Sequence, residues 1–247
     1  MEYRMKIKRI VWKASKEKCL GTVIAVLILG CAFALGRETA RYTGAMRADV
    51  EKSGPCVVID AGHGGDDPGK IGINGALEKD INLKIAERLK KLLEAQDIRV
   101  VMTRETEQGL YDAGASNKKV QDMKRRVDKI READPVLTVS IHQNSYQQED
   151  IHGAQVFYYK DSTCGKELAE QIQDCLIRLA DPENHRVIKE NDSYYLLKKT
   201  STPIVIVECG FLSNTREAEK LSTEEYQEKI AWAVHMGVLR YLNGPGQ

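Results

Sequence analysis

The chain has 247 residues, of which 30% are charged and 42% hydrophobic, a balance typical of a folded globular protein. Its net charge of +1 is unevenly distributed, because residues 1–36 hold seven Lys/Arg and two acids, leaving 30 basic and 34 acidic residues beyond them. This mildly acidic remainder lacks the basic footprint of a nucleic-acid-binding protein, so we expect no nucleic-acid partner.

The first 36 residues form a basic head followed by an apolar segment. Residues 19–35 (CLGTVIAVLILGCAFAL) carry no charge and follow the seven basic residues of the head. This length is at the lower limit of a membrane-spanning helix, about 17–25 residues. We therefore predict a transmembrane anchor or signal segment at 19–36. The positive-inside rule then places the basic n-region 1–18 in the cytoplasm and the rest of the chain outside.

The processing of this apolar segment stays open. Residues 32–34 (AFA) resemble a signal-peptide cleavage site, and residues 28–31 (ILGC) faintly resemble a lipoprotein processing site. Cleavage would give a secreted protein, whereas the long basic head favours an uncleaved membrane anchor. A buried core helix is a third explanation, but such a helix would usually have a polar face. The polar residues 37–54 are expected to form a stalk.

From residue 55 to 242 the pattern is that of one α/β domain. Apolar runs predict strands that begin with 57–60, and helical spacing of apolar residues predicts the intervening helices. The alternation indicates a largely parallel sheet covered by helices on both faces. The expected strands after the first are 99–104, 135–144, 153–160, 193–199 and 202–210. The expected helices are 79–96, 118–133, 163–180, 215–221 and 223–242, with polar loops at 105–118 and 181–192.

Polar residues with catalytic chemistry stand at or just beyond the ends of three of these strands. His63, His142 and Glu208 each follow an apolar run, and the sites of open α/β sheets lie beyond the carboxyl ends of strands. Glu78 stands at the start of a helix. Catalytic zinc sites use three His or carboxylate ligands and keep one open position, and a nearby buried carboxylate can act as a general base. If these side chains converge, the chain is a metallohydrolase.

Each candidate ligand also has an ordinary structural explanation. A lone His63 would more often be a surface or core histidine, although the glycines around it allow close approach of the backbone. Glu78 could simply stabilise the positive end of a helix dipole. His142 could be a hydrogen-bonded histidine at a strand end. His152, His185 and His235 are expected to face solvent or to pack.

Two further alternatives concern the last strand. Glu208 could form a structural ion pair with Arg104 or Arg126, because a buried carboxylate needs a partner. Cys209 could be the nucleophile of a cysteine hydrolase. Cys209 directly follows Glu208, however, so on a strand the two side chains should point to opposite faces. None of the cysteines forms a CxxC motif, so a thiolate-based structural zinc site is not expected.

Four blocks in this order resemble the zinc-dependent N-acetylmuramoyl-L-alanine amidases of the bacterial wall. They are VVIDAGHGGDDPG (57–69), EKD (78–80), VSIHQNS (139–145) and VECGFLSN (207–214). The resemblance implies His63, Glu78 and His142 as Zn²⁺ ligands and Glu208 as the catalytic residue of a six-stranded α/β domain. It implies hydrolysis of the amide that joins N-acetylmuramic acid to the L-alanine of the stem peptide.

Within that family, the short anchored chain without wall-binding repeats is similar to the germination-specific amidases of endospore formers. That likeness implies removal of stem peptides for muramic-δ-lactam formation in the spore cortex. The implied partners are peptidoglycan, the membrane through the N-terminal segment, and an activating protein. A general wall autolysin, a non-catalytic wall-binding module of the same fold and a zinc peptidase that cuts within the stem peptide remain alternatives.

Overall fold

We describe a computed structural model of the chain for residues 30–39 and 54–244. The chain divides into two units, Met1–Ser53 and Gly54–Gln247. In the first unit the described part is a helix at 30–39, so the predicted basic n-region, residues 19–29 of the predicted anchor and most of the predicted stalk lie outside the described residues. Among 30–39 and 54–244, no helix combines the length and apolar character needed to cross a membrane.

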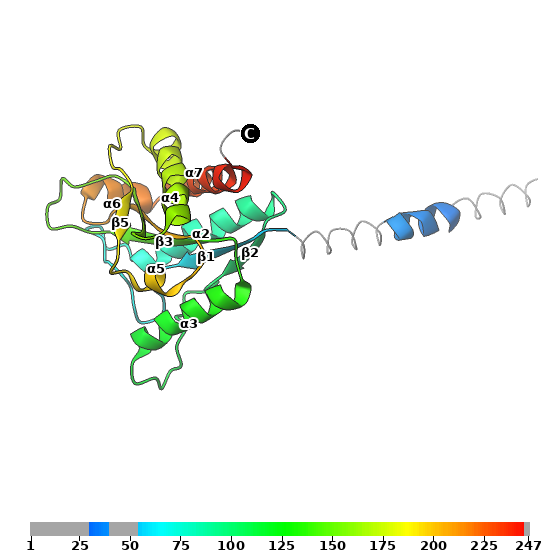
Figure 1. The fold of residues 1–247 in the computed structure, drawn as a ribbon, viewed down its shortest axis with the longest axis horizontal. Helices are drawn as coiled ribbons and strands as arrows, with labels where there is room; N and C mark the ends of the chain where they lie inside the picture. Colours follow the sequence, from blue (N-terminus) through cyan, green and yellow to red (C-terminus); the bar gives the residue numbers. More distant parts are fainter. Residues whose placement is uncertain (1–29, 40–53, 245–247) are drawn as a thin grey trace, which may run out of the picture. The chain divides into compact units, whose positions relative to one another are not determined.

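The second unit is an α/β domain built on a six-stranded sheet with the strand order β2-β1-β3-β6-β4-β5 (Figure 1). The strands follow the apolar runs of the sequence, except for the polar β5. Their bounds are β1 Cys56–Ala61, β2 Arg99–Met102, β3 Leu137–Asn144, β4 Gln155–Tyr159, β5 Lys189–Asn191 and β6 Ile204–Phe211.

The sheet is mixed, so the expectation of a largely parallel sheet was wrong. Strands β2, β1, β3 and β6 run parallel to one another, but β4 is antiparallel to β6, and β5 follows the direction of β4. The reason is the connection between β3 and β4, which spans residues 145–154 and contains no helix. A parallel return needs a crossover of about a dozen residues or more, usually helical, so β4 has to run back from the edge where β3 ends.

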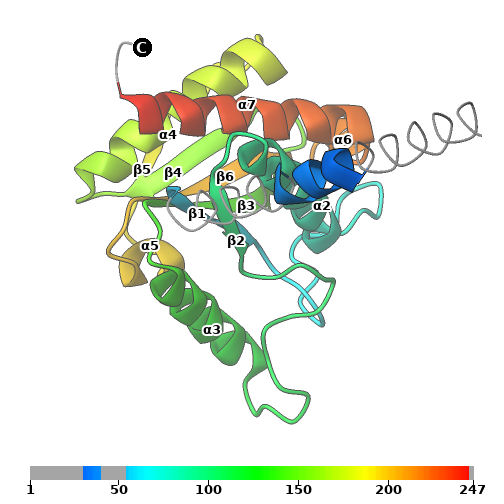
Figure 2. The same ribbon diagram turned by 90° about the vertical axis from the view of Figure 1, so that its right-hand side faces the viewer.

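Helices cover the two faces of the sheet unequally (Figures 1 and 2). α2 (Glu78–Glu94), α4 (Thr163–Cys175) and α7 (Glu224–Asn243) lie on one face, and α3 (Lys118–Ala133) and α5 (Tyr195–Lys199) on the other. Side chains that alternate along a strand pack against the helices of both faces. In β1, Val57 and Ile59 belong to one buried cluster and Val58 belongs to the other. The remaining elements are the π-helix Leu176–Ala180, which continues α4, and α6 (Thr215–Leu221).

Two local expectations were also wrong, both between β4 and β6. The segment predicted as a short strand, 193–199, contains helix α5, in which Leu196 and Leu197 are buried and Asn191 Oδ1 accepts a hydrogen bond from the backbone N–H of Tyr194 at 2.7 Å. Strand β5 lies in the stretch expected to be a loop, and its Lys-Glu-Asn sequence has no apolar pattern. This segment therefore forms strand β5 because it pairs with β4, and not because its own residues have a high strand propensity.

His235 of α7 predicts a pH-dependent stability. Its side chain is buried, neither ring nitrogen has a hydrogen-bond partner among the described residues, and burial lowers its pKa from 6.5. Protonation therefore favours the unfolded chain, and stability is lost as the pH falls below about 6.5 towards the lowered folded value. In urea unfolding at pH 7 and pH 5, His235→Leu should lose less stability on acidification than wild type. His185→Gln, at an exposed loop histidine, is the control; equal losses in wild type and His235→Leu would refute the prediction.

Candidate active site

The four candidate residues lie at one edge of the sheet, carried by four different elements. His63 follows the end of β1, and Glu78 is the first residue of α2. His142 of β3 and Glu208 of β6 are direct partners in the register of the two strands. Since paired residues on neighbouring strands project from the same face, Glu208 lies beside His142.

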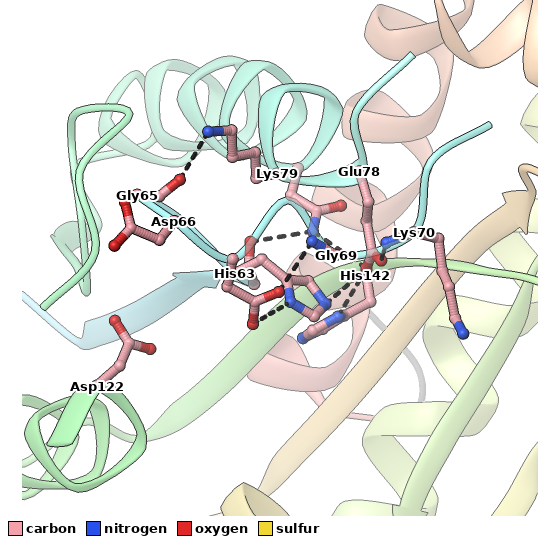
Figure 3. A network of polar contacts seen from close by, with 12 residues as sticks. His63, Gly65, Asp66, Gly69, Lys70, Glu78, Lys79, Asp122 and His142 are labelled. Carbon is pink, nitrogen blue, oxygen red and sulfur yellow. Dashed lines mark hydrogen bonds and ion pairs between the residues drawn. The ribbon is translucent and has the colours of Figure 1, made fainter. Parts of the chain in front are cut away.

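Glu78 joins the two histidines (Figure 3). Its Oε1 lies 3.0 Å from Nδ1 of His142 and 3.2 Å from Nε2 of His63. One ligand atom from each of the three residues lies within 4.8 Å of the other two, and no other group of this kind occurs in residues 30–39 and 54–244. Two imidazole nitrogens and a carboxylate oxygen are the donors found in catalytic zinc sites, so the three residues fit a zinc ion.

The carboxylate of Glu78 is fixed by the backbone as well. Its side chain is 2% exposed, Oε2 accepts a hydrogen bond from the Lys70 N–H at 2.7 Å, and Oε1 accepts one from the Gln143 N–H at 3.1 Å. Burial opposes ionisation, but the hydrogen bonds with His142 and His63 outweigh it and hold the pKa of Glu78 well below its usual range. The group is therefore an anion that a cation can bind without deprotonating it.

The loop after β1 has two features that only glycine allows. A Cβ at Gly62 would lie 2.2 Å from Cε1 of His142, and a Cβ at Gly69, which has φ +68°, would lie 2.5 Å from Oε2 of Glu78. Between them, Asp67 orients His63, with Oδ2 2.9 Å from Nδ1 of the ring and Oδ1 accepting the Gly69 N–H at 3.0 Å. This contact at Nδ1 leaves Nε2 of the His63 ring pointing towards Glu78.

A buried ion pair supports the same loop from below. Arg126 of α3 is 1% exposed, and its guanidinium lies 2.7 Å from Asp60 Oδ1 and 2.5 Å from Asp122 Oδ2. It also donates to the backbone carbonyls of Ala61 and His63. Burial raises the pKa of Asp60, but chiefly the charge of Arg126 outweighs it and lowers that pKa to about 2.

A second arginine ties the loop to the start of α2. Arg104 donates to the carbonyls of Ala61 at 2.9 Å, Gly62 at 3.0 Å and Lys79 at 2.7 Å. The alternative in which Glu208 forms an ion pair with Arg104 or Arg126 is therefore not observed. Both guanidinium groups are committed to the scaffold, and in the described part of the chain Glu208 forms no ion pair.

Glu208 is a buried carboxylate beside the three donors. Its side chain is 7% exposed, and its Oε2 has no hydrogen-bond partner among residues 30–39 and 54–244. Burial raises the pKa of Glu208 to about 7, while burial and the neighbouring Glu208 raise the pKa of Tyr194 to about 12. A carboxyl group with a pKa near neutrality can both accept and release a proton.

A cavity of about 410 Å³ opens onto this group of residues. His63, His142, Glu208 and Tyr194 contribute to its wall. Cys209 does not, because it points to the other face of the sheet, into the buried cluster shared with α2, α4 and α7, and burial raises the pKa of its thiol. The cysteine-hydrolase alternative is thus opposed by the geometry.

Several residues of the site were not identified as site residues from the sequence. Asp60 and Asp67 stand in the first sequence block, but only the fold shows that one pairs with Arg126 and the other orients His63. The sequence contained a hint that Arg126 is buried, because Arg126 adjoins Val127 on the apolar face of its helix. The structure confirms that both residues are buried. Tyr194 carried none, because it stands in a segment expected to be a strand.

Comparisons with known proteins agree on one family. The family described as N-acetylmuramoyl-L-alanine amidase matches residues 57–240. The germination-specific N-acetylmuramoyl-L-alanine amidase of Bacillus subtilis (strain 168) is 36% identical over 197 residues, which are 78% of this chain and 82% of that protein.

Solved structures agree with this match. The CwlD amidase from Clostridioides difficile, solved in complex with the GerS lipoprotein, is 42% identical with a TM-score of 0.75, covering 76% of this chain and 98% of that one. An N-acetylmuramoyl-L-alanine amidase from Clostridium difficile 630 is 32% identical with a TM-score of 0.70, covering 78% and 99%.

Removing the buried guanidinium should destabilise the domain. Arg126→Met leaves the carboxylates of Asp60 and Asp122 buried without their cation, so the free energy of unfolding should fall by about 3–5 kcal/mol. The control is Arg125→Met, the next residue along α3, whose ion pair with Asp112 is exposed and should contribute little. Equilibrium unfolding in guanidinium chloride measures the free energy of unfolding of both variants. Equal effects would show that the buried pair does not fix the loop.

Proposed function

Because the chain belongs to the N-acetylmuramoyl-L-alanine amidase family, we propose that it hydrolyses the amide between N-acetylmuramic acid and L-alanine in peptidoglycan with the help of zinc. The observation that supports this most directly is the convergence of His63, Glu78 and His142 beside the buried carboxylate of Glu208. The amidase class follows from the family, and zinc and the residue roles are the proposal.

The three donors would hold the zinc ion. When bound, zinc supplies Lewis-acid polarisation of the scissile carbonyl and lowers the pKa of water. Asp67 keeps the His63 ring oriented through Nδ1, as carboxylates beside metal-ligating histidines commonly do. The backbone N–H groups of Lys70 and Gln143 hold Glu78 in place, so the donors are positioned before any ion enters.

Glu208 would move the protons of the reaction. As an anion it takes a proton from the attacking water while the water oxygen bonds to the carbonyl carbon. It then gives the proton to the alanine nitrogen as the C–N bond breaks. The products are the free lactyl carboxylate of the sugar and the free amine of the peptide. In the absence of the ion, burial raises the pKa of Glu208 to about 7, and a carboxyl group whose pKa lies near neutrality can accept and then release a proton.

We place this reaction in the spore cortex. The description of the Bacillus subtilis relative as germination-specific supports a role in spores. In the cortex, removal of stem peptides by this chain would permit muramic-δ-lactam to form. The test is mass spectrometry of cortex fragments from a strain that lacks the protein. Loss of muramic-δ-lactam supports the cortex role, whereas unchanged cortex with altered vegetative wall favours a general wall amidase.

The domain would work outside the cytoplasm, attached to the membrane by the predicted 19–36 segment. We expect the full chain in the membrane fraction after an alkaline wash, and a chain lacking residues 1–36 outside it; equal partitioning would exclude the anchor. An assembly with a lipoprotein, as in the CwlD–GerS structure, is the form of protein partner we propose. Size-exclusion chromatography of this chain mixed with a purified candidate lipoprotein would detect the complex.

Two variants separate metal binding from proton transfer. His63→Ala removes a donor and should lose both bound zinc and hydrolysis. Glu208→Gln should keep zinc and lower the hydrolysis rate by about 10²–10⁴-fold or more, because only the proton carrier is lost. Elemental analysis measures zinc, and mass spectrometry of digested wall measures released L-alanine amines.

His185→Ala, at an exposed loop histidine, is the control for both measurements. Full turnover by Glu208→Gln would remove the proposed proton role. A wild-type protein without zinc or activity would support a wall-binding module. Cleavage at a bond further along the stem peptide would identify a zinc peptidase.

A further inference from the structure

The start of α3 contributes two lysines to the wall of the active-site cavity. Lys118 and Lys119 line the same cavity as His63, His142 and Glu208. They come from α3, which lies on the other face of the sheet from α2 (Figure 2). The loop residue Tyr111 lies next to them in that wall. The wall of the cavity that contains Glu208 therefore also carries cationic side chains.

The two lysines differ in what they contact. Nζ of Lys118 lies 2.5 Å from Oδ2 of Asp66 and 5.3 Å from the centre of the Tyr111 ring. Lys119 forms no ion pair or hydrogen bond with any residue of 30–39 and 54–244, although its charge helps to lower the pKa of Asp67. The adjacent carboxylate of Asp67 is already engaged by His63 and the Gly69 N–H.

The other cation of the cavity is not available to a substrate. Arg126 lines the cavity too, but its guanidinium is buried and bound to Asp60, Asp122 and two carbonyls. Lys118 is neutralised by Asp66. Among the described residues that line the cavity, Lys119 is thus the one Lys or Arg whose charge is not compensated by an ion pair.

The helix itself gives no reason for a lysine at this position. Lys118 and Lys119 are the first two residues of α3, and the first turn has no acidic residue. The helix dipole is positive at this end and disfavours a cation. Lys119 is exposed, as Lys124 is, so what distinguishes Lys119 is its place in the wall of the cavity.

We propose that Lys119 determines specificity by recognising a free carboxylate on the peptide side of the scissile amide. Because this rests on the proposed function, the substrate chemistry is that of a muramyl peptide. The residue after L-alanine in such peptides is a glutamyl residue joined through its side chain, which leaves its α-carboxyl group either free or amidated. Lys119 would favour the free acid over the amide.

The test compares two substrates that differ in that one group. Both are muramyl tripeptides in which the side-chain carboxyl of the glutamyl residue is already joined to the third residue; one has the free α-carboxylate and the other has its amide. With the zinc-loaded full chain, we expect wild type to prefer the acid by about two- to fivefold in kcat/KM, the range of a partly exposed ion pair. The preference should appear in KM and should shrink as salt is added.

Variants assign the preference to one side chain. Lys119→Gln should remove it, and Lys119→Glu should reverse it by repelling the acid. Lys124→Gln, on the same helix but outside the cavity wall, should keep the wild-type ratio. Bound zinc should be the same in all three, since none of them alters a residue of the His63, Glu78, His142 group.

Calorimetric binding of both substrates to Glu208→Gln gives a second measurement that does not depend on turnover. Equal binding of acid and amide, or a preference that survives Lys119→Gln, overturns the inference. If wild type cleaves neither substrate and leaves intact peptidoglycan unchanged, the proposed function fails. Tighter binding of the acid that depends on Lys119 would in that case still support carboxylate recognition.

Discussion

One carboxylate oxygen connects the separate parts of this site. Oε1 of Glu78 contacts a histidine from the loop after β1 and a histidine from β3, and it also accepts the Gln143 N–H. These elements are distant in sequence, so their approach is a product of the sheet order, in which β1 and β3 are neighbours. Since an unpaired buried carboxylate would be costly, the two imidazoles and the backbone donors are what make the position of Glu78 tolerable.

The two buried arginines of the scaffold bind the loop after β1 rather than the proposed reacting groups. Arg126 binds Asp60 and the carbonyls of Ala61 and His63, and Arg104 binds carbonyls of the same loop and of α2. A buried ion pair contributes little net stability compared with an apolar replacement, but it fixes one arrangement of the groups that it bonds. Here the arrangement that it fixes is the backbone that carries His63.

The sequence predicted the convergence of the candidate residues better than it predicted the arrangement of the sheet around them. The apolar runs that lead into His142 and Glu208 indicated where the candidate side chains would meet, because the carboxyl ends of neighbouring parallel strands lie together. Glu78 could not be predicted as a ligand from the pattern, since a carboxylate at a helix start has an ordinary explanation, and the prediction came from the family resemblance alone. The reversal of β4 and the polar strand β5 depend on pairing between distant segments, which local propensity does not encode.

The two glutamates of the site illustrate how position sets chemistry. Both are buried, yet hydrogen bonds with two histidines overcome burial and lower the pKa of Glu78, whereas burial raises that of Glu208 to about 7. Titratable groups of one type whose pKa values are pushed apart are suited to different roles. Glu208 forms no ion pair with the guanidinium of Arg126, which is held by Asp60 and Asp122. Glu78 therefore suits the role of an anion that a cation can bind, and Glu208 suits the role of a group that accepts and then releases a proton.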